Sequence, residues 1–276
     1  MLAKPRQTGV GVRWMIVSHK HKIIFLKPRK VAGTSFEIAL SKYLDDKDIV
    51  TPISRLDEEA RTERGFQGPC NFNFGLVKLF TKNPNKPVSF SNWELPQKFY
   101  NHISASAAKR RLDAAVWRDY RKVSIVRNPW DRAISIFFWK NTKKRKKIFP
   151  DIANFTQYFQ DKPQLLEINY PNYMINGADI IDTYVRFEHF EKDILALEKQ
   201  VPSLSGLWDT FSQTSAKAGT RDVSRSTPAE IYANNPLVHS QIEKLNAWEI
   251  KRFSYRLPQY ILPWIAASLT FLNTIA

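Results

Sequence analysis

Residues 23–44, which read IIFLKPRKVAGTSFEIALSKYL, decide the fold class of this chain. Four apolar residues suited to a β-strand, 23–26, lead into a basic turn that contains Gly33, and apolar residues at helical spacing follow. Thr34 and Glu37 have the spacing of a capping box, which predicts that a helix starts here. A strand that passes through a short turn into a helix is typical of α/β proteins.

Two further segments repeat this pattern. Residues 123–126 (VSIV) are followed by Asn128, the expected N-cap of the next helix, and by Pro129 at its first position. Residues 183–187 (TYVRF) are followed by a helix that we expect to reach about Lys199. The three repeats predict an α/β architecture.

Thr227-Pro228 and Asn235-Pro236 indicate two later helix starts. No internal repeat or linker divides the sequence, so we expect a single domain over residues 1–276. The tail 257–276 is mostly apolar, but prolines interrupt it, which favours a packed C-terminal element over a membrane span. Contact of this tail with a membrane surface stays open as an alternative.

Composition limits the class of protein. The 276 residues include 42 Lys and Arg against 26 Asp and Glu, a net charge of +16, and 43% are hydrophobic. This excludes intrinsic disorder and collagen-like or low-complexity chains. The positive surplus indicates an anionic partner, which composition leaves open between nucleic acid, a membrane surface, and a polyanionic small molecule or glycan. The densest run, Lys143–Lys147 (KKRKK), is either a nucleic-acid patch or the basic end of a helix.

A single cysteine, Cys70, rules out an intramolecular disulfide, and no apolar run near Met1 resembles a signal peptide. We therefore expect a cytoplasmic protein, with peripheral contact at the inner face of the membrane as an alternative. No set of Cys, His, Asp and Glu in the sequence has the spacing of a zinc site.

Two of the strand-to-helix turns carry groups suited to phosphate. In residues 30–35 (KVAGTS), a lysine and a glycine precede a helix start, where backbone N–H groups and the helix dipole favour an anion. The Walker pattern has its lysine after the last glycine, whereas Lys30 precedes Gly33, which disfavours an ordinary nucleoside-triphosphatase loop. In the second turn, Arg127 ends a strand and Ser135 lies about two turns into the next helix. Ligands of parallel sheets bind outside the carboxyl ends of the strands, so the two turns predict a site for two phosphates of one molecule.

Three segments together resemble the sulfotransferases that use 3′-phosphoadenosine 5′-phosphosulfate (PAPS), and are most similar to the bacterial and carbohydrate branch with its 2-O-type glycan sulfotransferases. KPRKVAGTSFEIALS (27–41) looks like the family's 5′-phosphosulfate loop, VRNPWDRAISIFFW (126–139) like its 3′-phosphate motif, and VRFEHFEKD (185–193) like a later strand and helix. The resemblance implies a P-loop-like, three-layer α/β fold with a central parallel sheet flanked by helices. It also implies PAPS as donor with PAP as product, no metal, and transfer to a hydroxyl or amine.

The resemblance also implies roles for individual residues. Lys30 matches the lysine that contacts the phosphosulfate and the leaving oxygen, and is therefore a catalytic candidate. Lys217 and Arg221 lie in a basic loop where the family closes over the 3′-phosphate, although plain solvated surface is an equal alternative. The full set matched to the donor nucleotide is Lys30, Gly33, Thr34, Ser35, Arg127, Ser135, Lys217 and Arg221. Related enzymes often have a small residue before this lysine, whereas the present sequence has Arg29 there.

Sulfuryl transfer needs in-line positioning and a base for the attacking hydroxyl. His102 lies in a segment that resembles the base-bearing segment of the 2-O-type enzymes, and we expect it to be the general base. A carboxylate of the acidic cluster 57–59 (DEE) is the rival base. Several aromatic residues would stack on sugar rings if they are not core residues: Trp93, Tyr100, Trp139, Tyr170 and Tyr173.

The sequence thus predicts a PAPS-dependent sulfotransferase that modifies a hydroxyl of a carbohydrate or glycoconjugate acceptor. A P-loop-type kinase or other nucleotide-binding enzyme is one alternative, and it requires Mg²⁺ and a Walker-type lysine. A non-enzymatic basic module for nucleic acid or anionic membrane is the other, and it leaves the two anion loops unexplained. Nucleic acid is accordingly the less expected partner.

Overall fold

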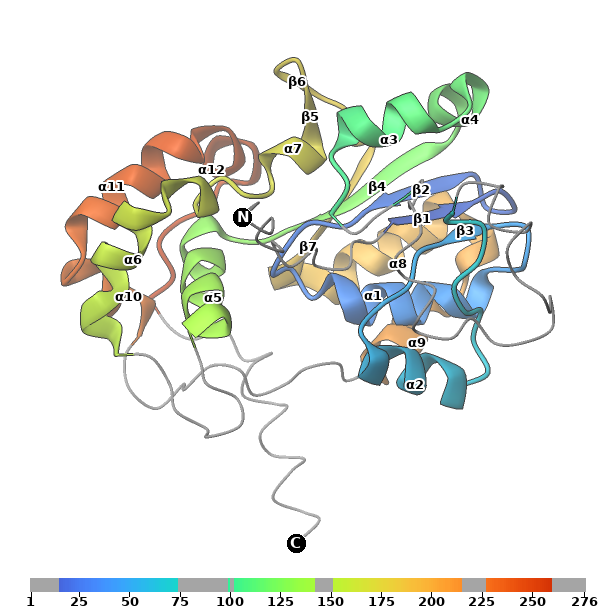
Figure 1. Ribbon diagram of the computed structural model, residues 1–276, viewed down its shortest axis with the longest axis horizontal. Helices are drawn as coiled ribbons and strands as arrows, with labels where there is room; N and C mark the ends of the chain where they lie inside the picture. Colours follow the sequence, from blue (N-terminus) through green and yellow to red (C-terminus); the bar gives the residue numbers. More distant parts are fainter. Residues whose placement is uncertain (1–14, 74–98, 100–101, 142–150, 215–226, 260–276) are drawn as a thin grey trace, which may run out of the picture. The chain divides into compact units, whose positions relative to one another are not determined.

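The computed structural model describes residues 15–73, 99, 102–141, 151–214 and 227–259 (Figure 1). The chain divides into two compact units, each built from three separate segments. Unit 1 comprises Met1–Lys27, Glu37–Ser124 and Asn172–Thr183, and unit 2 comprises Pro28–Phe36, Ile125–Pro171 and Tyr184–Ala276. The expectation of a single domain over residues 1–276 stays a prediction.

Five strands form one sheet in the order β3-β1-β2-β4-β7. They are β1 (Met15–Ser18), β2 (Ile23–Leu26), β3 (Ile49–Val50), β4 (Arg121–Val126) and β7 (Thr183–Arg186). β2 and β4 run parallel, with Phe25 opposite Val123, which confirms the α/β class and the three expected strands. The P-loop-like and three-layer details stay predictions.

The sheet is mixed rather than wholly parallel because β1 runs antiparallel to both β2 and β3. Neither β1 nor β3 was among the expected strands. Only four residues join β1 to β2, with Lys22 at φ 52°, and so short a connection permits only an antiparallel pair. Every residue of β1 and β2 is buried, which accounts for the apolar composition of both strands apart from Ser18.

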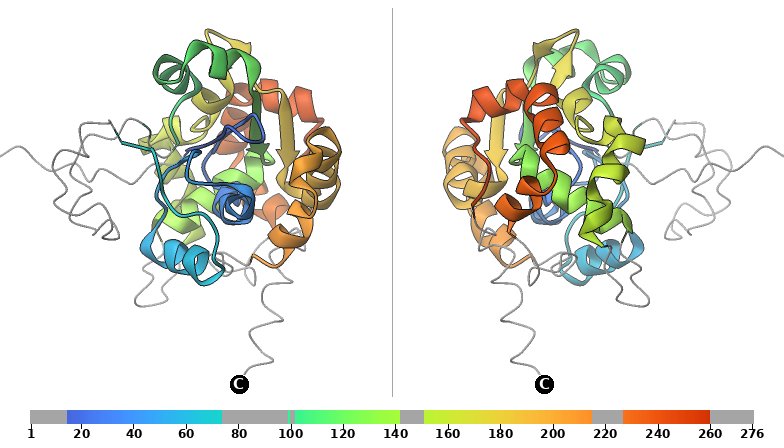
Figure 2. Two further views of the ribbon diagram at one scale, coloured as in Figure 1. Left: turned by 90° about the vertical axis from the view of Figure 1, so that its right-hand side faces the viewer. Right: turned by 90° about the vertical axis from the view of Figure 1, so that its left-hand side faces the viewer.

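In unit 1, helices lie on both sides of these strands. α3 (Ala105–Arg111) and α4 (Ala114–Asp119) lie on one side and α2 (Arg55–Glu63) on the other (Figures 1 and 2). Unit 1 also contains a small antiparallel hairpin of β5 (Met174–Ile175) and β6 (Ala178–Asp179).

A buried ion pair links the end of β2 to helix α1 (Gly33–Leu40). Lys27 Nζ lies 2.5 Å from an oxygen of Glu37, and both side chains are at most 5% exposed. Burial raises the pKa of Glu37, and the lysine opposes that effect. The capping box expected from Thr34 and Glu37 is therefore wrong: α1 already begins at Gly33, and the Glu37 carboxylate binds Lys27.

Unit 2 is organised around α5 (Pro129–Asn141). The expected start of this helix is confirmed, since Asn128 Oδ1 accepts hydrogen bonds from the backbone of Trp130 and Asp131. The apolar face of α5 packs in an aromatic core in which the ring of Phe137 lies 5.2 Å from that of Phe155 and 5.4 Å from that of Tyr158.

The other helices of this core are α6 (Phe155–Asp161), α10 (Pro228–Ala233), α11 (Pro236–Leu245) and α12 (Ala247–Phe253). The Thr227 capping box and the start at Asn235-Pro236 are confirmed. The remaining helices are α7 (Tyr170–Tyr173), α8 (Phe190–Gln200) and α9 (Leu207–Ser212), with short 3₁₀ turns at Ser41–Tyr43, Ile152–Asn154, Pro163–Leu165, Phe187–His189 and Pro202–Leu204. None of the helices described is long and apolar enough to cross a bilayer.

Arg132 connects α5 to α12 through hydrogen bonds. Its side chain is 1% exposed, and it donates hydrogen bonds to Glu249 Oε2 at 2.5 Å and to Asn246 Oδ1 at 2.6 Å. Burial raises the pKa of Glu249, and Arg132 opposes the shift. The second arginine of the RNPWDR motif is thus bound to protein groups in the interior of unit 2.

Replacing Arg132 by Met should lower the free energy of unfolding by about 3–5 kcal/mol, because the substitution leaves the Glu249 carboxyl buried without its cation. Urea unfolding followed by circular dichroism measures the loss. The matched control is Arg118→Met, which breaks the exposed Arg118–Asp119 pair and should leave the free energy of unfolding nearly unchanged, because solvent screens such a pair. Equal losses in the two variants would contradict the assignment of Arg132 to the framework of unit 2.

Candidate functional site

The loop between β2 and α1 has an unusual backbone. Lys30 has φ 60° and Ala32 has φ 57°, whereas Val31 between them and Gly33 after them do not have positive φ. Alternation of left-handed with other backbone conformations is found in anion-binding loops, where successive backbone N–H groups point to one side. The loop leads directly into the first turn of α1, whose N–H groups add to the same positive field. Ser35 is buried and Thr34 is half-buried in that turn.

Arg127 joins this loop to α5. Its Nε donates to Asp131 Oδ2 at 2.7 Å, its Nη2 lies 2.6 Å from the same oxygen, and its Nη1 donates to the Lys30 carbonyl at 2.8 Å. The guanidinium also lies over the Phe187 ring, 4.0 Å from the ring centroid. A guanidinium has five N–H groups, so about two stay available for an anion after these three contacts. Lys30 and Arg127 both belong to unit 2, and a direct hydrogen bond connects the two phosphate motifs there.

Ser135 lies on the face of α5 that carries Asp131 and Trp139, because residues four apart in a helix share a face. At one end of this face Asp131 holds Arg127, and at the other end the Trp139 ring lies 5.1 Å from Lys30 Nζ. The structure thus brings Lys30, Arg127 and Ser135 together, with Trp139 as an exposed neighbour.

The loop is also held at Arg29. Asn169 Oδ1 accepts from the Arg29 N–H at 2.7 Å, and Asn169 Nδ2 donates to the Arg29 carbonyl at 2.9 Å. Asn169 is completely buried. Asn169, Asp131 and Phe187 were not among the residues expected in the site. The segment 169–178 (NYPNYMINGA) was expected to be a loop, and this expectation is wrong, because α7, β5 and the start of β6 lie within it.

His102 lies in unit 1, and its ring is fixed by the backbone. Its Nδ1 is 2.9 Å from the Lys27 carbonyl, which accepts hydrogen bonds only, so Nδ1 carries the proton and the neutral ring has its lone pair on Nε2. The residue also has φ 51°. Lys30, Ala32 and His102 are three of the seven non-glycine residues with positive φ in the described chain, and such strained positions cluster at functional sites.

The carboxylates of the acidic cluster 57–59 are engaged within or beside α2. Asp57 accepts from Ser54 Oγ, and Glu59 pairs with Arg55 at the surface. Glu58 accepts from the Ile53 N–H and pairs with Arg61, and burial raises its pKa. These contacts give all three carboxylates structural partners.

Several expected residues lie outside the described part of the chain: Lys217, Arg221, Trp93, Tyr100, the basic run 143–147 and the tail from residue 260. Among the remaining aromatic candidates, Trp139 and Tyr170 are exposed, whereas Tyr173 is completely buried and belongs to the core.

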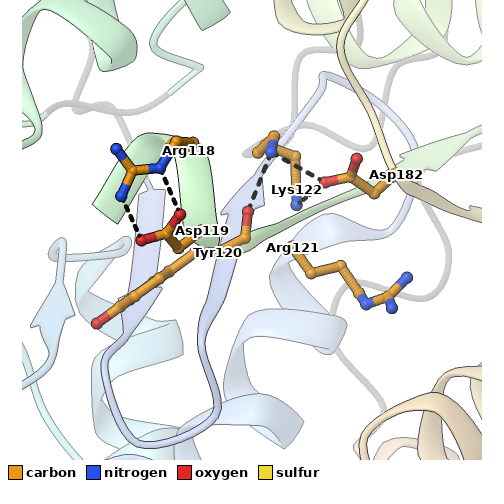
Figure 3. A pocket seen from close by; sticks show the side chains of 6 residues that line it. All are labelled: Arg118, Asp119, Tyr120, Arg121, Lys122 and Asp182. Atoms are coloured by element: carbon orange, nitrogen blue, oxygen red, sulfur yellow. Dashed lines mark hydrogen bonds and ion pairs between the residues drawn. The ribbon is translucent and has the colours of Figure 1, made fainter. Parts of the chain in front are cut away.

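A shallow pocket lies on unit 1 at the start of β4 (Figure 3). Its lining pairs Arg118 with Asp119 and Lys122 with Asp182, so two of its cations are already neutralised. None of the residues predicted for the site lines this pocket, whose walls are Arg118, Asp119, Tyr120, Arg121, Lys122 and Asp182. It therefore adds nothing to the candidate site.

The strain at Ala32 is testable. A left-handed φ costs an ordinary residue roughly 1–2 kcal/mol but costs glycine almost nothing, so Ala32→Gly should raise the free energy of unfolding by about 0.5–1 kcal/mol. Thermal unfolding measures the change. Ala39→Gly is the control, because Ala39 lies inside α1, where glycine should destabilise by a similar amount. Destabilisation by both substitutions would contradict the left-handed geometry of the loop.

Comparison with known proteins gives one match. No curated protein and no solved structure matches the chain significantly. A model of the sulfotransferase family, in contrast, matches residues 13–256, a range that includes both phosphate motifs and His102. A match over that range shows that the chain belongs to the sulfotransferase family.

Proposed function

We propose that the protein transfers the sulfuryl group of PAPS to a hydroxyl of a carbohydrate or glycoconjugate acceptor. One observation carries the proposal: Arg127 of the second motif donates a hydrogen bond to the Lys30 carbonyl within the strained, anion-binding loop of the first. This hydrogen bond supports one site in which the two motifs would supply separate anion-binding groups, as a donor with phosphates at both its 3′ and 5′ positions requires.

The residues present fit such a donor. N–H groups of Gly33, Thr34 and Ser35 at the start of α1 would bind the 5′-phosphosulfate, and the Lys30 ammonium would neutralise charge on the leaving oxygen. The remaining Arg127 donors and the Ser135 hydroxyl would bind the 3′-phosphate. PAPS supplies an activated sulfuryl group whose leaving group is the 5′-phosphate of PAP. We keep Lys217 and Arg221 as further proposed ligands.

His102 is the proposed general base. The Lys27 carbonyl accepts a hydrogen bond from Nδ1–H, and Nε2 would accept the proton of the acceptor hydroxyl as the sulfuryl group arrives. The carboxylates 57–59 are weaker candidates because each already has partners on or beside α2. The exposed rings of Trp139 and Tyr170 support a sugar-containing acceptor, since aromatic faces stack on sugar rings.

The proposal includes a cytoplasmic location, with peripheral membrane contact as the alternative, and catalysis without a metal. No group of three or more His, Cys, Asp or Glu side chains able to hold a metal is found in the described part of the chain. The metal requirement is therefore tested directly in the first experiment.

Titration calorimetry with PAP in EDTA should show micromolar binding, on the order of −8 kcal/mol. Lys30→Ala and Arg127→Ala should each weaken it at least tenfold, because each removes a cation from a phosphate position. Arg118→Ala, which removes an exposed cation of unit 1, is the control and should bind as the wild type does.

Binding of ATP only with Mg²⁺ would favour the kinase alternative. Binding of DNA that weakens steeply with salt, together with no binding of PAP, would favour the basic-module alternative.

His102→Asn tests the base separately. Asparagine tolerates the left-handed backbone, and its amide can donate to the Lys27 carbonyl as Nδ1 does, but it has no base at the position of Nε2. We expect kcat to fall by about 10²–10⁴-fold while the Kd for PAP is unchanged. His189→Asn, at an exposed position in unit 2, is the control. If His102→Asn keeps the kcat of the wild type, His102 is not the base. Glu58→Gln is then the next variant to measure.

A further inference from the structure

The strained loop requires support from the rest of unit 2. Two left-handed residues cost roughly 1–2 kcal/mol each, and such conformations persist only where neighbouring groups enforce them. Hydrogen bonds from side chains hold three backbone groups ahead of Ala32. They are the N–H and carbonyl of Arg29, bound by Asn169, and the carbonyl of Lys30, bound by Arg127.

The Asn169 contact is specific in its geometry. One amide side chain both accepts from and donates to the same residue, as a neighbouring β-strand would, and it comes from 140 positions further along the chain. Because Asn169 is completely buried, no solvent competes for these two bonds. Removing the amide would leave a backbone donor and a backbone acceptor unpaired beside Lys30.

We propose that Asn169 is a positioning residue of the donor loop, which fixes Arg29 so that Lys30 and the N–H groups after it keep their anion-binding conformation. The inference rests on the proposed function. In that site the loop binds the 5′-phosphate end of the nucleotide, whereas Arg127 and Ser135 bind the 3′-phosphate. Asn169 therefore acts on the 5′ end alone, and it touches no ligand atom itself.

Two ligands separate this role from a general structural one. PAP carries 3′- and 5′-phosphates, and adenosine 3′-monophosphate lacks the group that the loop binds. By calorimetry, Asn169→Ala should weaken PAP binding at least tenfold, or about 1.4 kcal/mol, and leave adenosine 3′-monophosphate binding within twofold. A variant that merely destabilises unit 2 would weaken both ligands alike.

Asn235→Ala is the matched control. Asn235 is also a buried asparagine of unit 2 that accepts one hydrogen bond, from Thr156 Oγ1, and donates another, to the Ile231 carbonyl. It belongs to the start of α11, and its replacement should change neither affinity. Asn169→Ser serves if Asn169→Ala fails to fold, because serine keeps a polar group in place but is too short to reach both groups of Arg29. The same selective loss is expected.

Three results overturn the proposal. If a folded Asn169 variant binds PAP as the wild type does, the amide does not position the loop. If both ligands weaken equally, Asn169 is only structural. If the wild type does not bind PAP at all, the donor site itself is wrong and this inference falls with it. Failure of the proposed function is measured in the wild type, whereas failure of the Asn169 proposal is measured only in the variants. The two failures are therefore distinguishable.

Discussion

The candidate site depends on one buried guanidinium. Arg127 is shared between the Asp131 carboxylate of the helix that follows it, α5, and a backbone carbonyl of the loop that precedes α1. Without Asp131, a buried cation would carry a large desolvation cost, and without the carbonyl of Lys30 the loop would lose its contact with α5. The arrangement leaves Arg127 oriented before any ligand arrives, so little ordering of this side chain is required on binding.

The parts that local sequence signals predicted are those whose interactions are local. Asn128 and Thr227 each bond N–H groups two or three residues away, and both helix starts follow the sequence pattern. Glu37 has the same local spacing relative to Thr34, yet its carboxylate binds Lys27 at the end of β2, because a buried cation competes more strongly than a backbone N–H. β3 has only two residues, too few for any periodicity to show.

The candidate site likewise contains residues that the sequence predicted and residues that it did not. Lys30, Arg127 and Ser135 stand in recognisable motifs, and the structure places them within one unit. Asn169 belongs to no motif, because its partner is 140 residues away. The contact is made to the backbone of Arg29, so it does not depend on which side chain stands at position 29. The positive φ at Lys30 and Ala32 could not be predicted from the sequence either. Glycine is the residue that indicates a left-handed conformation, and neither position is a glycine.

The buried pair of Lys27 and Glu37 has a consequence for how the family's sequences vary. Each side chain is held in the interior by the other, so the loss of either alone strands a charge, whereas the joint replacement of both by apolar residues removes the cost altogether. We therefore expect positions 27 and 37 to vary together in relatives. Relatives should carry both charges or neither, and this covariation would mark the junction of β2 and α1 in chains whose loop motif has diverged.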